Sequence, residues 1–385
     1  MGQGEAVGDM CRRAIAVIIA VGAMATALRA QMATADRVQG AGWWPTKAAA
    51  ARNDYVGAAE CAACHRREAA TQPATSMART MTRAHSSEPL RANRHLEFKA
   101  GRYAYEIRTD DRQSVYSVSD GDATLSAPLT WAFGVGKVGQ SFIFAQDGSF
   151  HEARVSYYDA VHALDFTPAR AAATPRTIGE AAARTVGAAE ARRCFACHAT
   201  APSADGIFDP DAATPGVTCE ACHGPGRAHV EAMRDRRTGD GRVAILNPAK
   251  LEPVDVVDFC GACHATFWDV KLADEKGIAA LRSQPYRLLS SKCWKGGDRR
   301  LTCIACHNPH VPLVRDAAAY DARCLSCHAA RGAERDTADT ADTAYRAPAC
   351  SVAAGGCATC HMPKYEVPEM HHAFTDHLIR VVRSR

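Results

Sequence analysis

Residues 219–229 read Cys-Glu-Ala-Cys-His-Gly-Pro-Gly-Arg-Ala-His, and the first five of them form a Cys-x-x-Cys-His motif. The chain of 385 residues contains seven such motifs, where its 17 cysteines and 16 histidines would produce only roughly 0.03 by chance. Their repetition makes this pentapeptide the feature that decides the fold. The motifs are Cys61–His65, Cys194–His198, Cys219–His223, Cys260–His264, Cys303–His307, Cys324–His328 and Cys357–His361.

Each motif predicts the covalent attachment of one c-type haem. Its two thiols lie on one turn of chain and form thioethers with the porphyrin, and the adjacent His binds the iron from the same side. Zinc knuckles and thioredoxin-like dithiols also use Cys-x-x-Cys, but neither requires a His after every pair. The predicted attachment residues are Cys61, Cys64, Cys194, Cys197, Cys219, Cys222, Cys260, Cys263, Cys303, Cys306, Cys324, Cys327, Cys357 and Cys360, with His65, His198, His223, His264, His307, His328 and His361 as proximal iron ligands.

Seven haems are a large load for a chain of this length. Roughly 50 residues are available for each haem, which is too few to enclose it in a domain of its own. Aromatic residues make up only 7% of the chain, as expected if porphyrins supply the large flat apolar surfaces. We therefore expect a mainly α fold with many loops, organised around stacked haems, with a small antiparallel β insertion.

The N-terminus is typical of a cleaved signal peptide at residues 1–30. Arg12 and Arg13 precede an apolar run that is shorter than the roughly 20 residues needed to cross a bilayer. No later segment is apolar enough to span a membrane, so we expect a mature chain without an integral membrane segment. This pattern predicts export, to the periplasm or an extracellular face.

The rest of the chain divides by composition. Residues 31–54 are expected to be a linker, 55–93 a first haem-binding segment, 94–168 the antiparallel β insertion and 169–385 a six-haem domain. The β insertion contains no Cys, and Tyr103, Tyr105 and Ile107 alternate as in a strand. Asp147-Gly148 predicts a hairpin turn within it.

Nine histidines lie outside the motifs, enough to give nearly every iron a second His ligand. An iron with two strong ligands suits electron transfer, whereas an empty position suits catalysis on a small molecule. Asp376 could accept a hydrogen bond that fixes the tautomer of a neighbouring ring. The candidate second ligands are His229, His310, His371, His372, His377, His95, His85 and Met77, although Met77 could equally fill an apolar gap.

Two further features bear on compartment and partners. Cys293 and Cys350 could form a disulfide in an exported protein, or remain as two thiols or a stray metal contact. The formal charge of +4 is offset by the haem propionates, so we expect no nucleic-acid partner. We expect redox proteins as electron donors and acceptors instead.

The chain resembles the multihaem c-type cytochromes related to the tetrahaem electron acceptor of hydroxylamine oxidoreductase. Cys219-Glu-Ala-Cys-His-Gly-Pro-Gly-x-x-His229, Cys303-Ile-Ala-Cys-His-Asn-Pro-His310, Cys357-Ala-Thr-Cys-His-Met-Pro363 and Thr375-Asp-His377 carry this resemblance. It implies haems stacked in parallel and perpendicular pairs, with His229 and His310 as second iron ligands. The chain departs from such relatives in its seven motifs, its β insertion and Met77.

We therefore expect an exported heptahaem cytochrome that moves single electrons, and we favour a carrier over an enzyme. One alternative is an oxidoreductase with a five-coordinate haem that acts on a small nitrogen or oxygen species, as in the related pentahaem nitrite reductases and hydroxylamine oxidoreductase. The chain contains no Cys-x-x-Cys-Lys, the hallmark of that nitrite reductase site. A second alternative is a polymerising cytochrome in which a His of one chain binds a haem of the next.

Overall fold

The computed structural model describes residues 50–235, 244–277, 279–295, 300–326, 328 and 355–381. About 38% of it is helical and 24% is strand, in six antiparallel sheets, so the expectation of a mainly α fold is wrong. The error has a physical cause: strands of two to four residues carry no alternating pattern, and only tertiary pairing reveals them. The predicted signal peptide at 1–30, residues 31–49 of the predicted linker, Cys327 and Cys350 lie outside the described residues.

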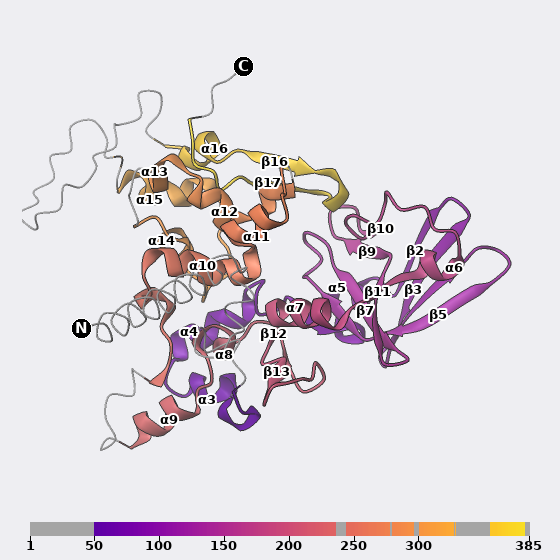
Figure 1. The fold of residues 1–385 in the computed structure, drawn as a ribbon, viewed down its shortest axis with the longest axis horizontal. Helices are drawn as coiled ribbons and strands as arrows, with labels where there is room; N and C mark the ends of the chain where they lie inside the picture. The colour runs from indigo at the N-terminus through magenta and orange to yellow at the C-terminus, as the bar shows by residue number, and fades with distance from the viewer. Residues whose placement is uncertain are drawn as a thin grey trace, which may run out of the picture.

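The chain forms two parts that lie side by side in Figure 1. The β half, residues 81–186, contains the two largest sheets. The motif half, residues 50–80 and 188–381, contains the described motif residues on short helices. Among the described residues, no helix is long and apolar enough to cross a membrane.

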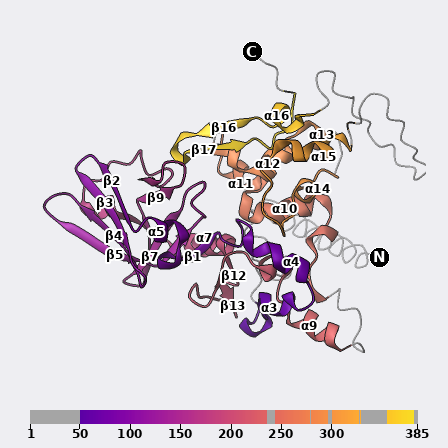
Figure 2. The same cartoon turned by 180° about the vertical axis from the view of Figure 1, so that it is seen from behind.

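A four-stranded meander forms the outer side of the β half (Figure 2). Tyr103, Tyr105 and Ile107 are buried on one strand, and Tyr116 and Val118 on the next, which confirms the predicted alternation. These side chains form the main hydrophobic core with residues of the neighbouring sheet. The strands are β2 (His95–Ala100), β3 (Tyr103–Thr109), β4 (Ser114–Ser119) and β5 (Thr124–Leu129).

The five-stranded sheet supports the second motif. Its β7–β8 turn holds Asp147 and Gly148 at φ angles of 50° and 73°, which confirms the hairpin predicted there. Trp131 and Phe133 of this sheet pack against Phe195, which lies inside the second motif. The strands are β1 (Met81–Arg83), β6 (Trp131–Phe133), β7 (Ser141–Gln146), β8 (Ser149–Ala153) and β11 (Ala183–Val186), and β9 (Val155–Tyr158) pairs with β10 (Ala163–Phe166) beside them.

The motif half has little apolar core of its own. Among its described residues, the hydrophobic cluster confined to this half contains a single buried residue, Ala262, with partly buried Leu246, Leu251 and Phe259. Such a sparse core fits a protein part whose interior is completed by bound apolar groups. Its helices are α3 (Ala58–Ala62), α4 (Arg66–Thr71), α7 (Ala188–His198), α8 (Cys219–His223), α9 (Arg227–Arg234), α10 (Pro253–His264), α11 (Phe267–Leu272), α12 (Gln284–Leu289), α13 (Lys292–Lys295), α14 (Cys303–Cys306), α15 (Asp321–Leu325) and α16 (Cys357–His361).

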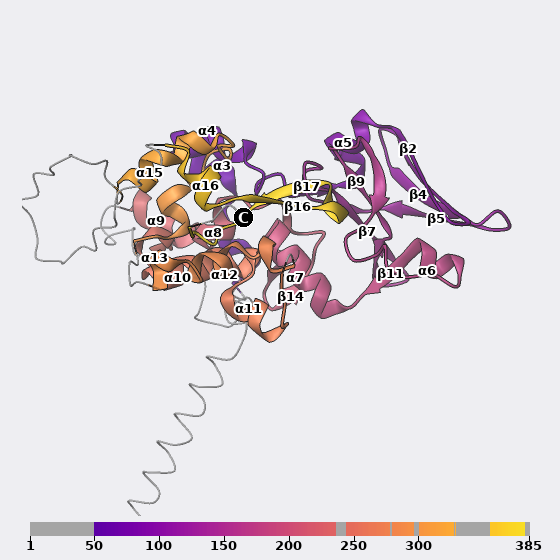
Figure 3. The same cartoon turned by 90° about the horizontal axis from the view of Figure 1, so that it is seen from above.

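A C-terminal hairpin joins the two halves. It consists of β16 (Lys364–Val367) and β17 (His372–Thr375), and its tip reaches the β half near β9 in Figures 1 and 3. There, Nε2 of His371 lies 2.8 Å from a carboxylate oxygen of Asp165 in β10. The hairpin therefore ties the last motif to the β half.

Candidate haem sites

The described parts of all seven motifs lie in or directly after short helices. The first Cys of each motif lies in α3, α7, α8, α10, α14, α15 or α16. A Cys-x-x-Cys spacing on one helical turn brings both thiols to the same face, and the His follows at the end of that turn. The backbone therefore presents two thiols and one imidazole together, as covalent haem attachment requires.

Three motif histidines direct Nδ1 to a backbone carbonyl. Nδ1 of His223 lies 2.8 Å from the carbonyl oxygen of Leu246, and Nδ1 of His361 lies 2.9 Å from that of Arg380. Nδ1 of His198 lies 3.1 Å from the carbonyl oxygen of Thr80 and 2.7 Å from its hydroxyl. A ring that donates from Nδ1 keeps its lone pair on Nε2, which is therefore the atom available to a metal.

Three motif histidines also face a histidine from outside the motifs. The ring centroids are 6.4 Å apart for His65 and His229, 5.9 Å for His223 and His310, and 6.2 Å for His307 and His377. Two imidazole nitrogens about 2.0 Å from one metal ion, on opposite sides of it, place the centroids roughly 6.2 Å apart, because each centroid lies about 1.1 Å behind its nitrogen. The centroid separations of the three pairs therefore match the spacing of two imidazoles bound to one iron.

Burial keeps several of these rings uncharged. It lowers the pKa of His377 to about 4, and it also lowers the pKa values of His223 and His307. A neutral imidazole is the form that binds a metal. These three rings are thus in the ligating state at neutral pH.

The motifs are paired in space. Helix α3 contacts α8, α10 contacts α14, and α15 contacts α16. At these contacts, the thiols of Cys61 and Cys219, of Cys260 and Cys303, and of Cys324 and Cys357 lie close enough to shift each other's pKa. These contacts bring together the first and third, the fourth and fifth, and the sixth and seventh motifs. The second motif contacts the fourth, where Sγ of Cys197 lies 3.5 Å from the carbonyl oxygen of Ala262.

Buried charge stabilises the C-terminal segment that follows β17 and carries His377. The side chain of Asp376 is fully buried and accepts hydrogen bonds from Arg287, Arg380 and the backbone N–H of Leu378. Burial alone would raise the pKa of Asp376, but these hydrogen bonds outweigh it and lower that pKa. The expectation that Asp376 binds a histidine ring is wrong, because Nδ1 of His377 lies 3.1 Å from the carbonyl oxygen of Thr375 instead.

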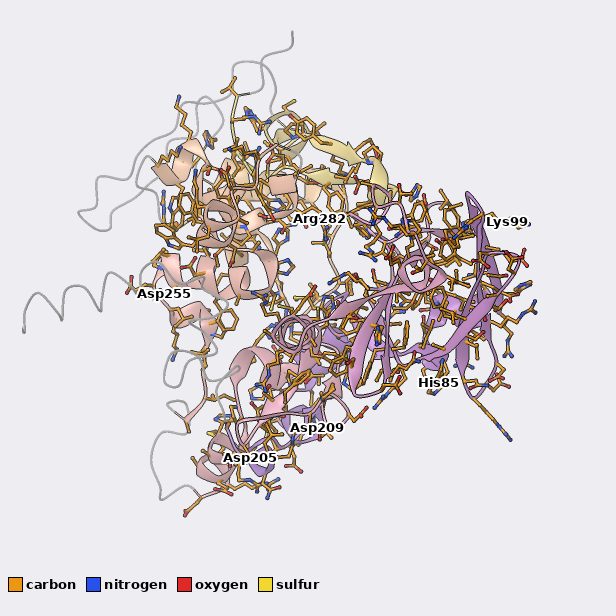
Figure 4. All side chains as sticks on the ribbon, turned by 45° about the vertical axis from the view of Figure 1, so that its right-hand side comes forward. His85, Lys99, Asp205, Asp209, Asp255 and Arg282 are labelled. Carbon is orange, nitrogen blue, oxygen red and sulfur yellow. The ribbon has the colours of Figure 1, made fainter. Side chains whose placement is uncertain are left out.

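The remaining candidate ligands lie elsewhere. Nε2 of His95 lies 2.6 Å from a carboxylate oxygen of Glu106 on the β half, and His371 contacts Asp165 as described above. His85 also lies on the β half, where Figure 4 labels it. His372 packs against Phe374, and the carbonyl oxygen of Met77 accepts a hydrogen bond from the N–H of Val217. As iron ligands, His85, His95, His371, His372 and Met77 stay predictions.

Residues that the sequence analysis missed hold the motifs in place. The carboxylate of Glu220 accepts two backbone N–H groups just before the first motif and one just after the third. The carboxylate of Asp321 accepts the N–H groups of Gly356 and Cys357 at the seventh motif. Thr71 donates its hydroxyl to the carbonyl oxygen of His310. No sequence pattern distinguishes these side chains from ordinary surface residues, since their partners are far away in the chain.

Comparison with known proteins gives a partial match. Residues 150–224, which include the second and third motifs, match the family model described as cytochrome c554 and c-prime. No curated protein matches the chain. Among solved structures, the outer cell wall cytochrome OcwA is similar, with a TM-score of 0.45 and 14% identity over 86% of this chain and 80% of that chain. The motifs and the family match define the chain as a multihaem c-type cytochrome with covalently bound haem c.

Proposed function

We propose that this cytochrome is exported, binds seven haems, and transfers single electrons along them to and from redox protein partners. We further propose kinship with the tetrahaem electron acceptor of hydroxylamine oxidoreductase. Haem iron, when bound, supplies reversible one-electron chemistry. The task of the chain is to hold the irons in order, exclude water and provide the ligands.

The facing histidine pairs carry this proposal. His229, His310 and His377 would complete the coordination begun by His65, His223 and His307, at the centroid separations given above. A site with two imidazoles leaves no position for a substrate. This arrangement favours outer-sphere electron transfer over catalysis at these three sites.

The contacts between motifs support a continuous order of sites. Beyond the three thiol pairs, Cys222 lies close enough to Cys260, and Cys306 to Cys324, for mutual electrostatic interaction. The spatial order would therefore be first, third, fourth, fifth, sixth and seventh motif, with the second beside the fourth. Closely spaced sites of this kind suit rapid transfer through one chain.

In this proposal, the N-terminal sequence indicates the cellular location of the protein. The arginine pair and short apolar run predict a cleaved signal, and the mature chain would act in the periplasm or on an extracellular face. Partners would dock through small, transient interfaces where a haem edge is exposed.

The test uses the haem-loaded, fully oxidised protein. We expect seven haems per chain by iron and haem assay, and only low-spin signals by electron paramagnetic resonance. A high-spin haem whose signal shifts on adding nitrite or hydroxylamine would overturn the carrier assignment. A haem count below seven would overturn the stoichiometry.

A further inference from the structure

Glu220 lies between the two cysteines of the third motif, on α8, yet its contacts are with other segments. Glu220 is only 3% exposed to solvent. Oε1 accepts the N–H of Val56 at 2.9 Å and that of Gly226 at 2.8 Å, and Oε2 accepts the N–H of Gly57 at 2.8 Å. One buried carboxylate thus binds two segments of chain that are far apart in sequence.

Each of these segments leads into a helix that carries one half of a histidine pair. Gly57 immediately precedes α3, which leads through Cys61 to His65. Gly226 immediately precedes α9, which carries His229. Figures 1 and 2 show α3 and α9 close together at the lower end of the motif half. Glu220 therefore binds the starting points of the two helices that bring His65 and His229 face to face.

The packing around Gly226 confirms how closely the segments approach. A Cβ atom added at Gly226 would lie 2.9 Å from Cγ2 of Val56 and 3.2 Å from Oε1 of Glu220. Both distances are shorter than ordinary van der Waals contact, so a side chain at this position would push the start of α9 away. Glycine is required here by space rather than by backbone conformation.

The chemistry of the contact favours a charged acceptor. Hydrogen bonds from backbone N–H groups to an ionised carboxylate are roughly twice as strong as those between neutral groups. An amide in place of the carboxylate would turn an NH₂ group toward at least one of the three backbone N–H groups, whichever way it is oriented. Glutamine at this position would therefore lose part of the contact and introduce a donor opposite a donor.

We propose that Glu220 is a positioning residue for the iron of the first motif: it holds the starts of α3 and α9 together so that His229 stays opposite His65. This inference rests on the proposed function, which assigns His229 as the second ligand of that iron. Without Glu220, His229 would leave the iron more often and expose a coordination position.

The experiment measures carbon monoxide binding to the reduced, haem-loaded full chain. Carbon monoxide binds only where a ligand has left. We expect Glu220→Gln to bind it at one haem per chain, on the order of tenfold to a hundredfold faster than wild type. His229→Ala should expose the same haem completely, which provides the reference spectrum.

Glu60→Gln is the matched control. Glu60 lies on α3 and pairs with Arg234 of α9 at 2.6 Å, but both side chains are exposed. Because exposed ion pairs contribute little, this variant should bind carbon monoxide like wild type. Gly226→Ala supplies a second test without a change of charge, and it should also accelerate binding at one haem.

The outcomes separate the two proposals. If His229→Ala exposes one haem but Glu220→Gln and Gly226→Ala both behave like wild type, the positioning role is overturned and the ligand assignment stands. If His229→Ala leaves the spectrum unchanged, the ligand assignment itself fails. If Glu220→Gln matures with fewer haems, Gly226→Ala decides the positioning role.

Discussion

The ring centroids of His223 and His310 lie 5.9 Å apart, and the two ring planes are only 7° from parallel. His223 ends the third motif, whereas His310 follows the fifth. Near the first motif, the hydroxyl of Thr71 donates a hydrogen bond of 2.6 Å to the carbonyl oxygen of His310. Three separate haem-binding segments therefore build one proposed coordination site. This arrangement makes each axial ligand sensitive to the packing of distant motifs.

His310→Ala should convert one haem from low spin to high spin. The His310 side chain is the proposed second ligand of the iron that His223 binds. The substitution leaves Cys219 and Cys222, which would attach that haem, unchanged. Visible and electron paramagnetic resonance spectra of the oxidised holoprotein would measure the change. His162→Ala, in an exposed turn of the β half, is the control and should retain a fully low-spin spectrum. An unchanged spectrum for His310→Ala would contradict the assignment.

Asp376→Asn should strongly destabilise the C-terminal segment that follows β17. Its carboxylate is fully buried between Arg287 and Arg380, and breaking such a buried pair typically costs about 3–5 kcal/mol. Chemical denaturation of the holoprotein would show the loss as a lower midpoint. Asp274→Asn is the matched control, since Asp274 and Lys276 form an exposed pair and the change should stay within about 0.5 kcal/mol. Equal midpoints for the two variants would contradict the prediction.

Gly216→Ala should disturb the approach to the third motif. Gly216 has a φ of +79°, and an added Cβ would lie 1.8 Å from the carbonyl oxygen of Ala78. We expect a loss of about 4 kcal/mol or more, measured by denaturation. Gly206→Ala separates the cost of the positive φ from the cost of the steric clash, because Gly206 has a similar φ of +73° but open space around it. That control should cost only about 1–2 kcal/mol.

Glu190→Gln should weaken the attachment of α7 to the β half in a pH-dependent way. Hydrogen bonds from Arg184, at 2.6 and 2.8 Å, lower the pKa of Glu190 below its ordinary value although partial burial opposes them. The ionised carboxylate therefore stabilises the fold above the ordinary Glu pKa of about 4.3, and this contribution disappears as the pH falls through the lowered value. Because Glu190 is 39% exposed, we expect about 1 kcal/mol or less at neutral pH.

Denaturation midpoints of wild type and Glu190→Gln, compared across pH, would test this. The difference should be present at neutral pH and vanish in acid. Glu231→Gln, which removes only a long, exposed contact with Arg227, should show no such difference. A difference that grows toward low pH would contradict the sign of the effect.

Local chemistry made part of this protein predictable. A Cys-x-x-Cys-His motif is contiguous, so each of the seven predicted attachment sites can be located in the sequence without knowledge of the fold. The alternation around Tyr105 and the Asp147-Gly148 turn are likewise properties of neighbouring residues, and the structure confirms both. The overall class was nevertheless wrong, because short strands such as β1 and β11 form only by pairing with distant strands.

By itself, the sequence determined the class of cofactor and predicted the residues that attach it, since thioether and imidazole chemistry requires those residue types at that spacing. Only the tertiary structure decided which histidines face each other, as His307 and His377 do, and which carboxylates, such as Glu220, hold the motifs together. These pairs join residues from separate segments. Their distances depend on how the whole chain packs, and no local pattern records them.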